Sequence, residues 1–353
     1  MTKGLFLKRI IAIFIFLFLN LGITVCAQTR YVDKKKFFTD GQLIEITLVA
    51  DLKKIINEKL KKDYQHSFQP ASITCRFPDS TKVTEAVEIR PRGQYRREEC
   101  YMPPIIINFK TSQAGTLKKL GHLKLVWPCV NSEYDEQLVL KEYLVYKIYN
   151  LLTERSFRVR LVKMECHDIK ERIKPRTMYA FFIEDVDDLA KRNNCVEVQS
   201  VRLNTESTDR KQTTMVTLFE YMIGNTDWAI PIYRNIKLMR SKENSLSRPF
   251  VVPYDFDFSG LVNANYAIPP SELIITSVRQ RFYLGFPRTL EELQAELRNF
   301  RSQKPAIDSL IMNLGQLSAF NKKDMIKYLD EFFKISEREK DIRDIFIYNA
   351  RKE

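Results

Sequence analysis

The first part of the chain alternates between apolar and polar residues over short stretches, which is the period of a β-strand. Pro, Gly, Asp and Ser residues separate these stretches and are typical of turns. Up to about residue 130 the alternating stretches are IEITLVA, SITCRF, AVEIRPRG, PPIIINFK and HLKLVWP. The pattern predicts a twisted antiparallel sheet for this part of the chain.

A helical period appears next, in EQLVLKEYLVYKIYNLL, residues 136–152. Apolar residues at 138, 144, 145, 148, 151 and 152 share one wide face of this segment, so we predict a helix that buries that face. Two more strand-like stretches follow the helix, FRVRLVKMECHD and TMYAFFIED.

From residue 186 onward helical patterns prevail. VDDLAKRN and TTMVTLFEYMIG, residues 213–224, each predict a helix, and Gly224 has the position of a helix-ending glycine. Two strands then form a hairpin around a polar turn, and the rest of the chain predicts helices. The hairpin strands are RNIKLMR and RPFVVPYD, and the helical stretches are TLEELQAELRNF, KPAIDSLIMNLG and KKDMIKYLDEFFKISEREKDIRDIFIYNARK.

The order of these elements predicts an α+β fold with two lobes. Residues 28–185 would form a β-rich N-lobe with one helix, and residues 186–353 a mainly helical C-lobe that contains the hairpin. We expect a hinge near Glu184 to Asp188. A cleft between two such lobes is a common place for a ligand.

Residues 1–27 are expected to lie outside this fold. Basic residues precede an apolar run from Ile10 to Val25, and the small or apolar residues at 25–27 suit a signal peptidase. We predict a secretory signal cleaved after Ala27, which makes the protein periplasmic or extracellular. Two alternatives stay open: an uncleaved membrane anchor, and a lipoprotein that uses Cys26.

The net charge bears on the kinds of partner that the protein can bind, and the cysteines bear on its disulfides. The chain has a net charge of +13, and removal of Lys3, Lys8 and Arg9 with the signal leaves +10. Basic residues are scattered, which is typical of a solvated surface, and no basic arm for nucleic acid stands out. The cysteines after residue 27 have no zinc-site spacing, so we expect one or two disulfides of open connectivity and one remaining thiol. They are Cys75, Cys100, Cys129, Cys166 and Cys195.

Candidate chemistry concentrates around the loop MIGNTDWAIPIYRNIKLM, residues 222–239. The loop carries Asp227 and Asn235, and the second hairpin strand ends in PYDFDFSG with Asp255 and Asp257. The hairpin would bring these side chains together. Carboxylate and amide oxygens suit Mg²⁺ or Mn²⁺, whose coordination substrate phosphates complete. A further carboxylate can orient or deprotonate an attacking hydroxyl, so the pattern predicts a phosphoryl-transfer site.

These residues resemble the spore-coat CotH kinase family, which has an atypical protein-kinase-like fold distantly similar to that of HipA-type kinases. The resemblance rests on RPRGQY at 90–95, FFIED at 181–185, NTDW to RN at 225–235 and PYDFDFSG at 253–260. It spans about residues 70 to 265. There is no GxSxG motif of a serine hydrolase and no Walker A motif in the sequence.

The resemblance implies Asp227 as the catalytic aspartate and Asn235 as a metal ligand. Asp255 would be the metal-binding aspartate of a DFG-like element, with Asp257 as the alternative in that role. Asp227 and Asn235 are eight residues apart, where protein kinases have about five, so we expect the loop to bulge. Tyr95 stands where the family has a small hydroxyl residue.

A kinase also needs a Lys–Glu pair that holds the nucleotide phosphates. Glu142, on the flank of the predicted helix, is the candidate glutamate, and Lys124 and Lys110 compete as the lysine. Nucleotide contacts are further expected from Arg92 and Gly93 in the RG loop and from Glu184 at the end of the hinge-side strand.

Together these expectations describe an exported atypical kinase that transfers the γ-phosphoryl group of ATP to a protein hydroxyl with Mg²⁺ or Mn²⁺. The basic charge favours an acidic or Ser-rich protein substrate, and the export signal argues against nucleic acid. Membrane contact is expected only through an uncleaved signal. Two alternatives stay open: a catalytically weak scaffold or binding protein of the cell envelope, and a basic protein that binds polyanions. The scaffold alternative is disfavoured by the retained metal-site residues.

Overall fold

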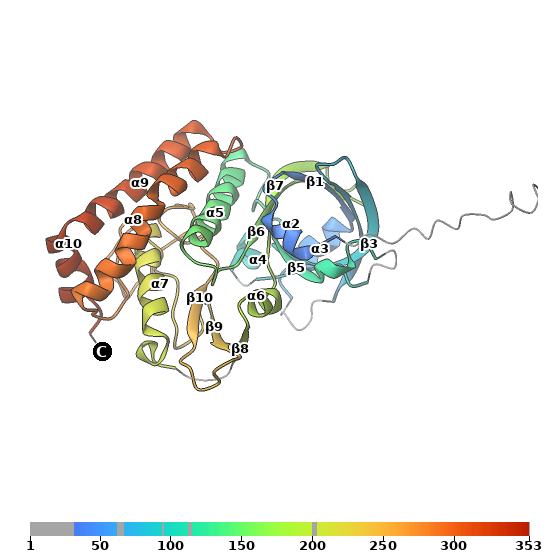
Figure 1. Ribbon diagram of the computed structural model, residues 1–353. Helices are drawn as coiled ribbons and strands as arrows, with labels where there is room; N and C mark the ends of the chain where they lie inside the picture. Colours follow the sequence, from blue (N-terminus) through green and yellow to red (C-terminus); the bar gives the residue numbers. More distant parts are fainter. Residues whose placement is uncertain (1–31, 62–66, 94, 112–114, 200–202, 353) are drawn as a thin grey trace, which may run out of the picture.

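The computed structural model describes residues 32–352 except 62–66, 94, 112–114 and 200–202. The first part of these residues forms a closed barrel in which the strands follow the order β1-β2-β3-β4-β5-β7-β6 (Figure 1). The alternating stretches of the sequence are strands, as predicted. They are β1 (Ile44–Ala50), β2 (Gln69–Arg76), β3 (Lys82–Pro91), β4 (Ile105–Asn108), β5 (His122–Val126), β6 (Val159–Asp168) and β7 (Arg176–Ile183).

Closure of the barrel contradicts the predicted fold class. Strands β1 and β6 pair in parallel, from Ile44 opposite Val162 to Ala50 opposite Asp168, while the other neighbours are antiparallel. A two-lobed protein-kinase-like fold with an antiparallel N-lobe sheet was therefore a wrong expectation. The physical reason is that alternation predicts which residues form strands, whereas closure depends on a pairing between strands that are far apart in sequence.

Two short helices help to fill the barrel core, α2 (Lys34–Thr39) and α3 (Leu52–Glu58). Asp33 and Asp51 cap them by accepting hydrogen bonds from backbone amides of the first turn, at 2.8 and 2.9 Å. With α4 (Tyr95–Glu99), they make the prediction of a single helix in this part wrong. These helices are too short for a clear helical period in the sequence.

The predicted long helix is α5 (Glu133–Leu152), which Ser132 caps. Leu140, Leu144 and Ile148 are fully buried in a core that α5 shares with β7 and with the helices of the C-terminal part. Figure 1 shows α5 between the barrel and α8. Residues from both predicted domains therefore contribute to one hydrophobic core.

The C-terminal part combines a small sheet with long helices. Its sheet has the order β10-β9-β8, and α7 packs against β10. Its elements are α6 (Val186–Arg192), β8 (Cys195–Val198), α7 (Arg210–Ile223), β9 (Ile236–Ser241), β10 (Phe250–Pro253), α8 (Leu290–Asn313), α9 (Ala319–Glu337) and α10 (Glu339–Arg343), followed by a π-helical turn (Asp344–Tyr348).

Two of the predicted helices are one helix. Pro305 lies inside α8, where proline removes a backbone hydrogen bond and usually kinks or breaks a helix. Phe300 on one side of it and Ile307 and Ile311 on the other are fully buried, so packing favours a continuous helix. The capping box of Thr289 and Glu292 fixes its start.

The five cysteines of the described residues divide into one disulfide and three thiols. Cys100 and Cys129 form the disulfide, and Cys75, Cys166 and Cys195 are buried thiols. Within the described part of the chain, no helix has the length and apolar character that a membrane crossing requires. The predicted signal, residues 1–27, lies outside the described residues.

Candidate functional site

The end of α7 fixes the start of the loop that carries Asp227. Gly224 ends the helix in the left-handed conformation, with φ +68°, as the sequence predicts. The Asn225 side-chain amide then donates to the Glu220 carboxylate at 2.9 Å, and its carbonyl oxygen accepts from the Asp227 backbone amide at 3.0 Å. The buried Glu220 of α7 thereby fixes the position of the loop at Asp227.

Asn235 closes the loop on Asp227. Its side-chain amide donates to the Asp227 backbone oxygen at 2.7 Å and to the Asp227 carboxylate at 2.9 Å. Between them, Ala229 and Arg234 exchange two backbone hydrogen bonds of 3.0 Å, so the additional residues form a tight turn. Asn235 itself has φ +51°, a conformation that asparagine tolerates better than most residues. The loop bulges as expected.

Asp255 and Asp257 follow β10 and lie beside this loop. The Tyr254 backbone amide donates to the Asn235 backbone oxygen at 3.0 Å, which ties the two segments together. Asp255 has φ +67°, and its backbone amide donates to the Tyr146 hydroxyl of α5 at 2.8 Å. Asp257 is buried and accepts a hydrogen bond of 3.0 Å from the Tyr266 hydroxyl.

The carboxylates of these segments influence one another electrostatically. Burial and the neighbouring Asp255 raise the pKa of Asp227 above its ordinary value, although Arg234 opposes the shift. Burial and Asp255 also raise the pKa of Asp257 to about 7, and burial together with Asp257 raises that of Glu142. We call Glu142, Asp227, Asp255 and Asp257 the acid cluster. Mutual repulsion in such a cluster favours the binding of a cation.

Basic side chains border the acid cluster. Burial, Arg92 and Lys237 lower the pKa of Lys124 to about 8, and its ammonium lies 5.4 Å from the centre of the Tyr254 ring. Arg96 lies 3.5 Å from Glu142, a member of the cluster. Carboxylates beside several cations could bind a metal together with phosphate groups.

Most of the residues singled out in the sequence lie together, and three have other surroundings. Asp227, Asn235, Asp255, Asp257, Glu142, Lys124 and Arg92 form or border the acid cluster. Glu184 instead binds Arg192 at 2.8 Å and the Arg158 backbone amide at 3.0 Å. Lys110 is exposed beyond the end of β4, beside Gly121. Gly93 is exposed with φ +81°, which suits glycine at this turn.

Four residues near the site had no signal in the sequence. Arg96 contacts Glu142, and Tyr266 contacts Asp257. The charge of Lys237 lowers the pKa of Lys124. Glu220 supports Asn225 from a position that reads as an ordinary helix residue. The family resemblance directed attention to lysines as the partner of Glu142, so the arginine was missed.

The donor atoms fit Mg²⁺ or Mn²⁺ in chemistry. Because the Asn235 amide nitrogen binds Asp227, its carbonyl oxygen is left to act as a ligand beside Asp255. Among the described residues no group of three or more His, Cys, Asp or Glu side chains is arranged to hold a metal ion. Mg²⁺ sites often use one or two carboxylates and complete their coordination with substrate phosphates and water.

Comparisons with known proteins add little. No family model matches the chain, and no curated protein matches it. A solved structure of the Helicobacter pylori proinflammatory kinase CtkA is similar at 11% identity with a TM-score of 0.37, over 60% of this chain and 86% of that chain. A TM-score of this size supports no conclusion about fold or function. The CotH resemblance therefore stays a prediction without support from a family match.

Proposed function

We propose that the protein is an ATP-dependent phosphotransferase that transfers the γ-phosphoryl group to a protein hydroxyl with the help of Mg²⁺ or Mn²⁺. The observation that carries this proposal is the hydrogen bond from Asn235 to the Asp227 carboxylate, 2.9 Å long, beside Asp255. A carboxylate for the hydroxyl, oxygen ligands for a metal and cations for phosphates are the parts that phosphoryl transfer requires.

Asp227 would orient the acceptor hydroxyl and take up its proton. Its pKa is raised by burial, which makes the carboxylate a better base than an exposed aspartate. The Asn235 hydrogen bond fixes one carboxylate oxygen and leaves the other for the hydroxyl. Arg234, whose guanidinium is 3.5 Å from that second oxygen, opposes the rise in the pKa of Asp227 and so favours the ionised carboxylate.

Asn235 and Asp255 would hold the metal ion, with Asp257 as a further or alternative ligand. A bound Mg²⁺ or Mn²⁺ supplies neutralisation of the charge on the phosphate oxygens. Lys124 and Arg92 would contact the phosphates, since both are half-buried, positively charged side chains near Asp255.

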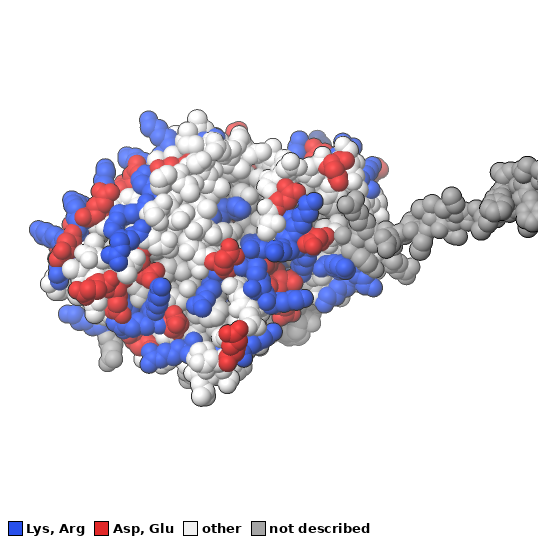
Figure 2. All heavy atoms as spheres, in the orientation of Figure 1, with Lys and Arg blue, Asp and Glu red and all other residues white. Residues whose placement is uncertain are grey.

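An exported location and a protein acceptor are part of the proposal. The Cys100–Cys129 disulfide supports export, because disulfides persist mainly outside the cytoplasm. Figure 2 shows Lys and Arg spread over the visible face among fewer Asp and Glu, which favours an acidic or Ser-rich protein as the acceptor. ATP is expected as the donor, and nucleic acid is not expected as a partner.

A second candidate is a binding protein of the cell envelope with little catalysis. The observation that favours it is the lack, among the described residues, of a three-acid group arranged for a metal ion. A binding protein would also be expected in a compartment that contains little ATP.

Thermal unfolding with ATP and Mn²⁺ or Mg²⁺ tests the proposal. A ligand at a hundred times its dissociation constant stabilises the folded state by about 2.7 kcal/mol. We expect a metal-dependent rise in Tm that Asp255→Ala abolishes and that Asp187→Ala, at an exposed carboxylate in α6, preserves. Transfer of labelled phosphate to casein, an acidic Ser-rich protein, separates an enzyme from a binding protein. No rise in Tm at millimolar nucleotide would refute the proposal.

A further inference from the structure

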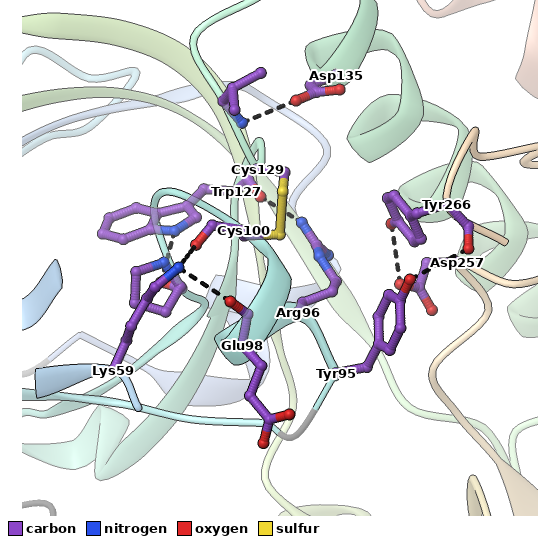
Figure 3. The surroundings of a disulfide bond; sticks show 12 residues. Lys59, Tyr95, Arg96, Glu98, Cys100, Trp127, Cys129, Asp135, Asp257 and Tyr266 are labelled. Carbon is purple, nitrogen blue, oxygen red and sulfur yellow. Dashed lines mark hydrogen bonds between the residues drawn. A yellow bond between two sulfur atoms is a disulfide. The ribbon is translucent and has the colours of Figure 1, made fainter. Parts of the chain in front are cut away.

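The buried ion pair of Arg96 and Glu142 joins the barrel to the acid cluster (Figure 3 shows Arg96). Their side chains are only 11% and 2% exposed, and the charged atoms are 3.5 Å apart. Arg96 also donates a hydrogen bond of 2.6 Å to the Trp127 backbone oxygen. A buried guanidinium without such partners would be strongly destabilising, so this arrangement constrains where Arg96 can lie.

Arg96 affects other members of the acid cluster besides its partner Glu142. Its positive charge lowers the pKa of Asp257, which lies near Glu142, and Asp255 in turn stabilises the charge of Arg96. The preceding residue adds a second link, because the Tyr95 ring packs 5.1 Å from Phe258 and 5.9 Å from Tyr266. The short helix α4 therefore contacts the loop after β10 through Tyr95 and acts on the carboxylates of that loop through the charge of Arg96.

A five-residue helix does not hold this position by itself, since isolated short helices are unstable. Cys100 follows α4 directly, and its disulfide partner Cys129 comes two residues after Trp127 and shortly before α5. The disulfide thus joins the segment that carries Arg96 to the segment that accepts its hydrogen bond and leads to Glu142. Lys59 braces the same place by donating to the backbone oxygens of Glu98 and Cys100 (Figure 3).

A small cavity adjoins the ion pair and the disulfide. Arg96, Cys129, Glu142, Asp257 and Tyr266 help to line a space of about 10 Å³, enough for one water molecule. Arg96 Nε and Glu142 Oε1 are buried there without a hydrogen-bond partner among the described residues. Cys129, one of the two disulfide cysteines, belongs to the lining of this space.

We propose that Arg96 is a positioning residue of the candidate site and that the Cys100–Cys129 disulfide holds it there. Reduction of the disulfide then weakens the binding of metal and nucleotide while the barrel stays folded. The inference rests on the proposed function for the identity of the ligand. Reduction by dithiothreitol gives two cysteine thiols, and dithiothreitol is oxidised to its cyclic disulfide with transfer of two electrons and two protons.

The first measurement compares ATP–Mn²⁺ binding by oxidised and dithiothreitol-reduced protein, by calorimetry. Loss of a residue that supports a metal site typically weakens binding by roughly 10- to 100-fold. We expect a loss of this size on reduction and in Arg96→Met. Arg96→Lys should lose less, because lysine keeps the charge but lacks the forked geometry. Arg160→Met, at a buried arginine of β6 that binds the Gln42 backbone oxygen, is the matched control and should bind normally.

The double variant Cys100→Ser/Cys129→Ser controls for side effects of the reductant. It should bind as weakly as the reduced protein and should not respond to dithiothreitol. Unchanged affinity in both the reduced protein and Arg96→Met would overturn the inference. Global unfolding on reduction, seen as loss of the far-ultraviolet circular dichroism signal, would also overturn it, because the disulfide would then support the whole fold.

Hydrogen exchange separates this inference from the proposed function. In the oxidised protein without ligand, the amides of residues 95–99 and 254–266 should exchange slowly, and reduction should accelerate both segments together. If the oxidised protein binds no ATP–Mn²⁺, the proposed function fails, but coupled acceleration would still support the positioning role. Unchanged exchange at residues 254–266 after reduction would overturn the role of the disulfide whatever the ligand.

Discussion

Replacement of Gly224 by alanine should strongly destabilise the protein and disturb both loops of the candidate site. An added Cβ would lie 2.0 Å from the hydroxyl oxygen of Tyr328, a distance that non-bonded atoms do not tolerate. Tyr328 cannot easily move away, because it is buried and the guanidinium groups of Arg279 and Arg281 lie 4.3 and 3.7 Å from the centre of its ring.

Two contributions set the magnitude. The left-handed conformation of residue 224, with φ +68°, costs a non-glycine residue about 1–2 kcal/mol. Overpacking of a filled core costs a further ~1–3 kcal/mol, so the free energy of unfolding should fall by about 2–5 kcal/mol in total. Because the Gly224 backbone oxygen accepts a hydrogen bond of 3.0 Å from Gly260, the displacement would reach the segment after Asp257 as well.

Three other glycines separate the two contributions, measured by denaturant unfolding. Gly93→Ala has φ +81° but open space around the added atom, so it should show only the conformational cost. Gly260→Ala has no positive φ, but its Cβ would lie 2.3 Å from the Val278 backbone oxygen, so it should show only the steric cost. Gly315→Ala has neither and should be nearly neutral. If Gly224→Ala loses no more stability than Gly93→Ala, the close packing against Tyr328 is refuted.

Two further predictions concern buried charge. Burial raises the pKa of Glu220 to about 8 and that of Asp257 to about 7. Between about pH 4 and about pH 8 the folded protein therefore keeps protons that the unfolded chain has released. The free energy of unfolding should accordingly fall as the pH rises from about 4 to about 8. Glu220→Gln should make the fall in Tm over this range shallower; an equal fall would contradict the assignment. Lys124→Met should reduce the rise in Tm with ATP and Mn²⁺, because it removes a cation near Asp255, whereas Lys110→Met should not. Equal losses in the two lysine variants would contradict the placement of Lys124 beside the phosphates.

Sequence patterns predicted most strands and most helices because period and capping are local properties, but the short strand β8 was not predicted. The strand 44–50 and the end of α7 at Gly224 agree with the structure. Closure of the barrel was not predicted, because the parallel pairing of β1 with β6 joins residues more than a hundred positions apart. At Pro305 the local signal was wrong. Proline predicted a break between two helices, but the burial of apolar residues on both sides of it favours one continuous helix α8.

The candidate site was predictable where its contacts are local. Asp227 and Asn235 belong to one loop, and the hairpin necessarily brings the segment after β10 back beside them. Glu184 pairs with Arg192, a partner that the sequence did not indicate, because a strand-ending glutamate has the same appearance whether it faces a ligand or a guanidinium. A charge pattern in sequence carries no information about which opposite charge it meets in space.

The partner of Glu142 illustrates this limit and also bears on function. Arg96 and Glu142 are brought together by the segment that runs from β3 through α4 and β5 into α5, and the disulfide fixes this path at two points. Lysine is a mobile point charge, whereas arginine can bind a carboxylate and a backbone oxygen at once. Arg96 does both, with Glu142 and Trp127. The arginine is therefore suited to fixing the wall of the acid cluster, which leaves Lys124 as the half-buried cation that phosphate groups could reach.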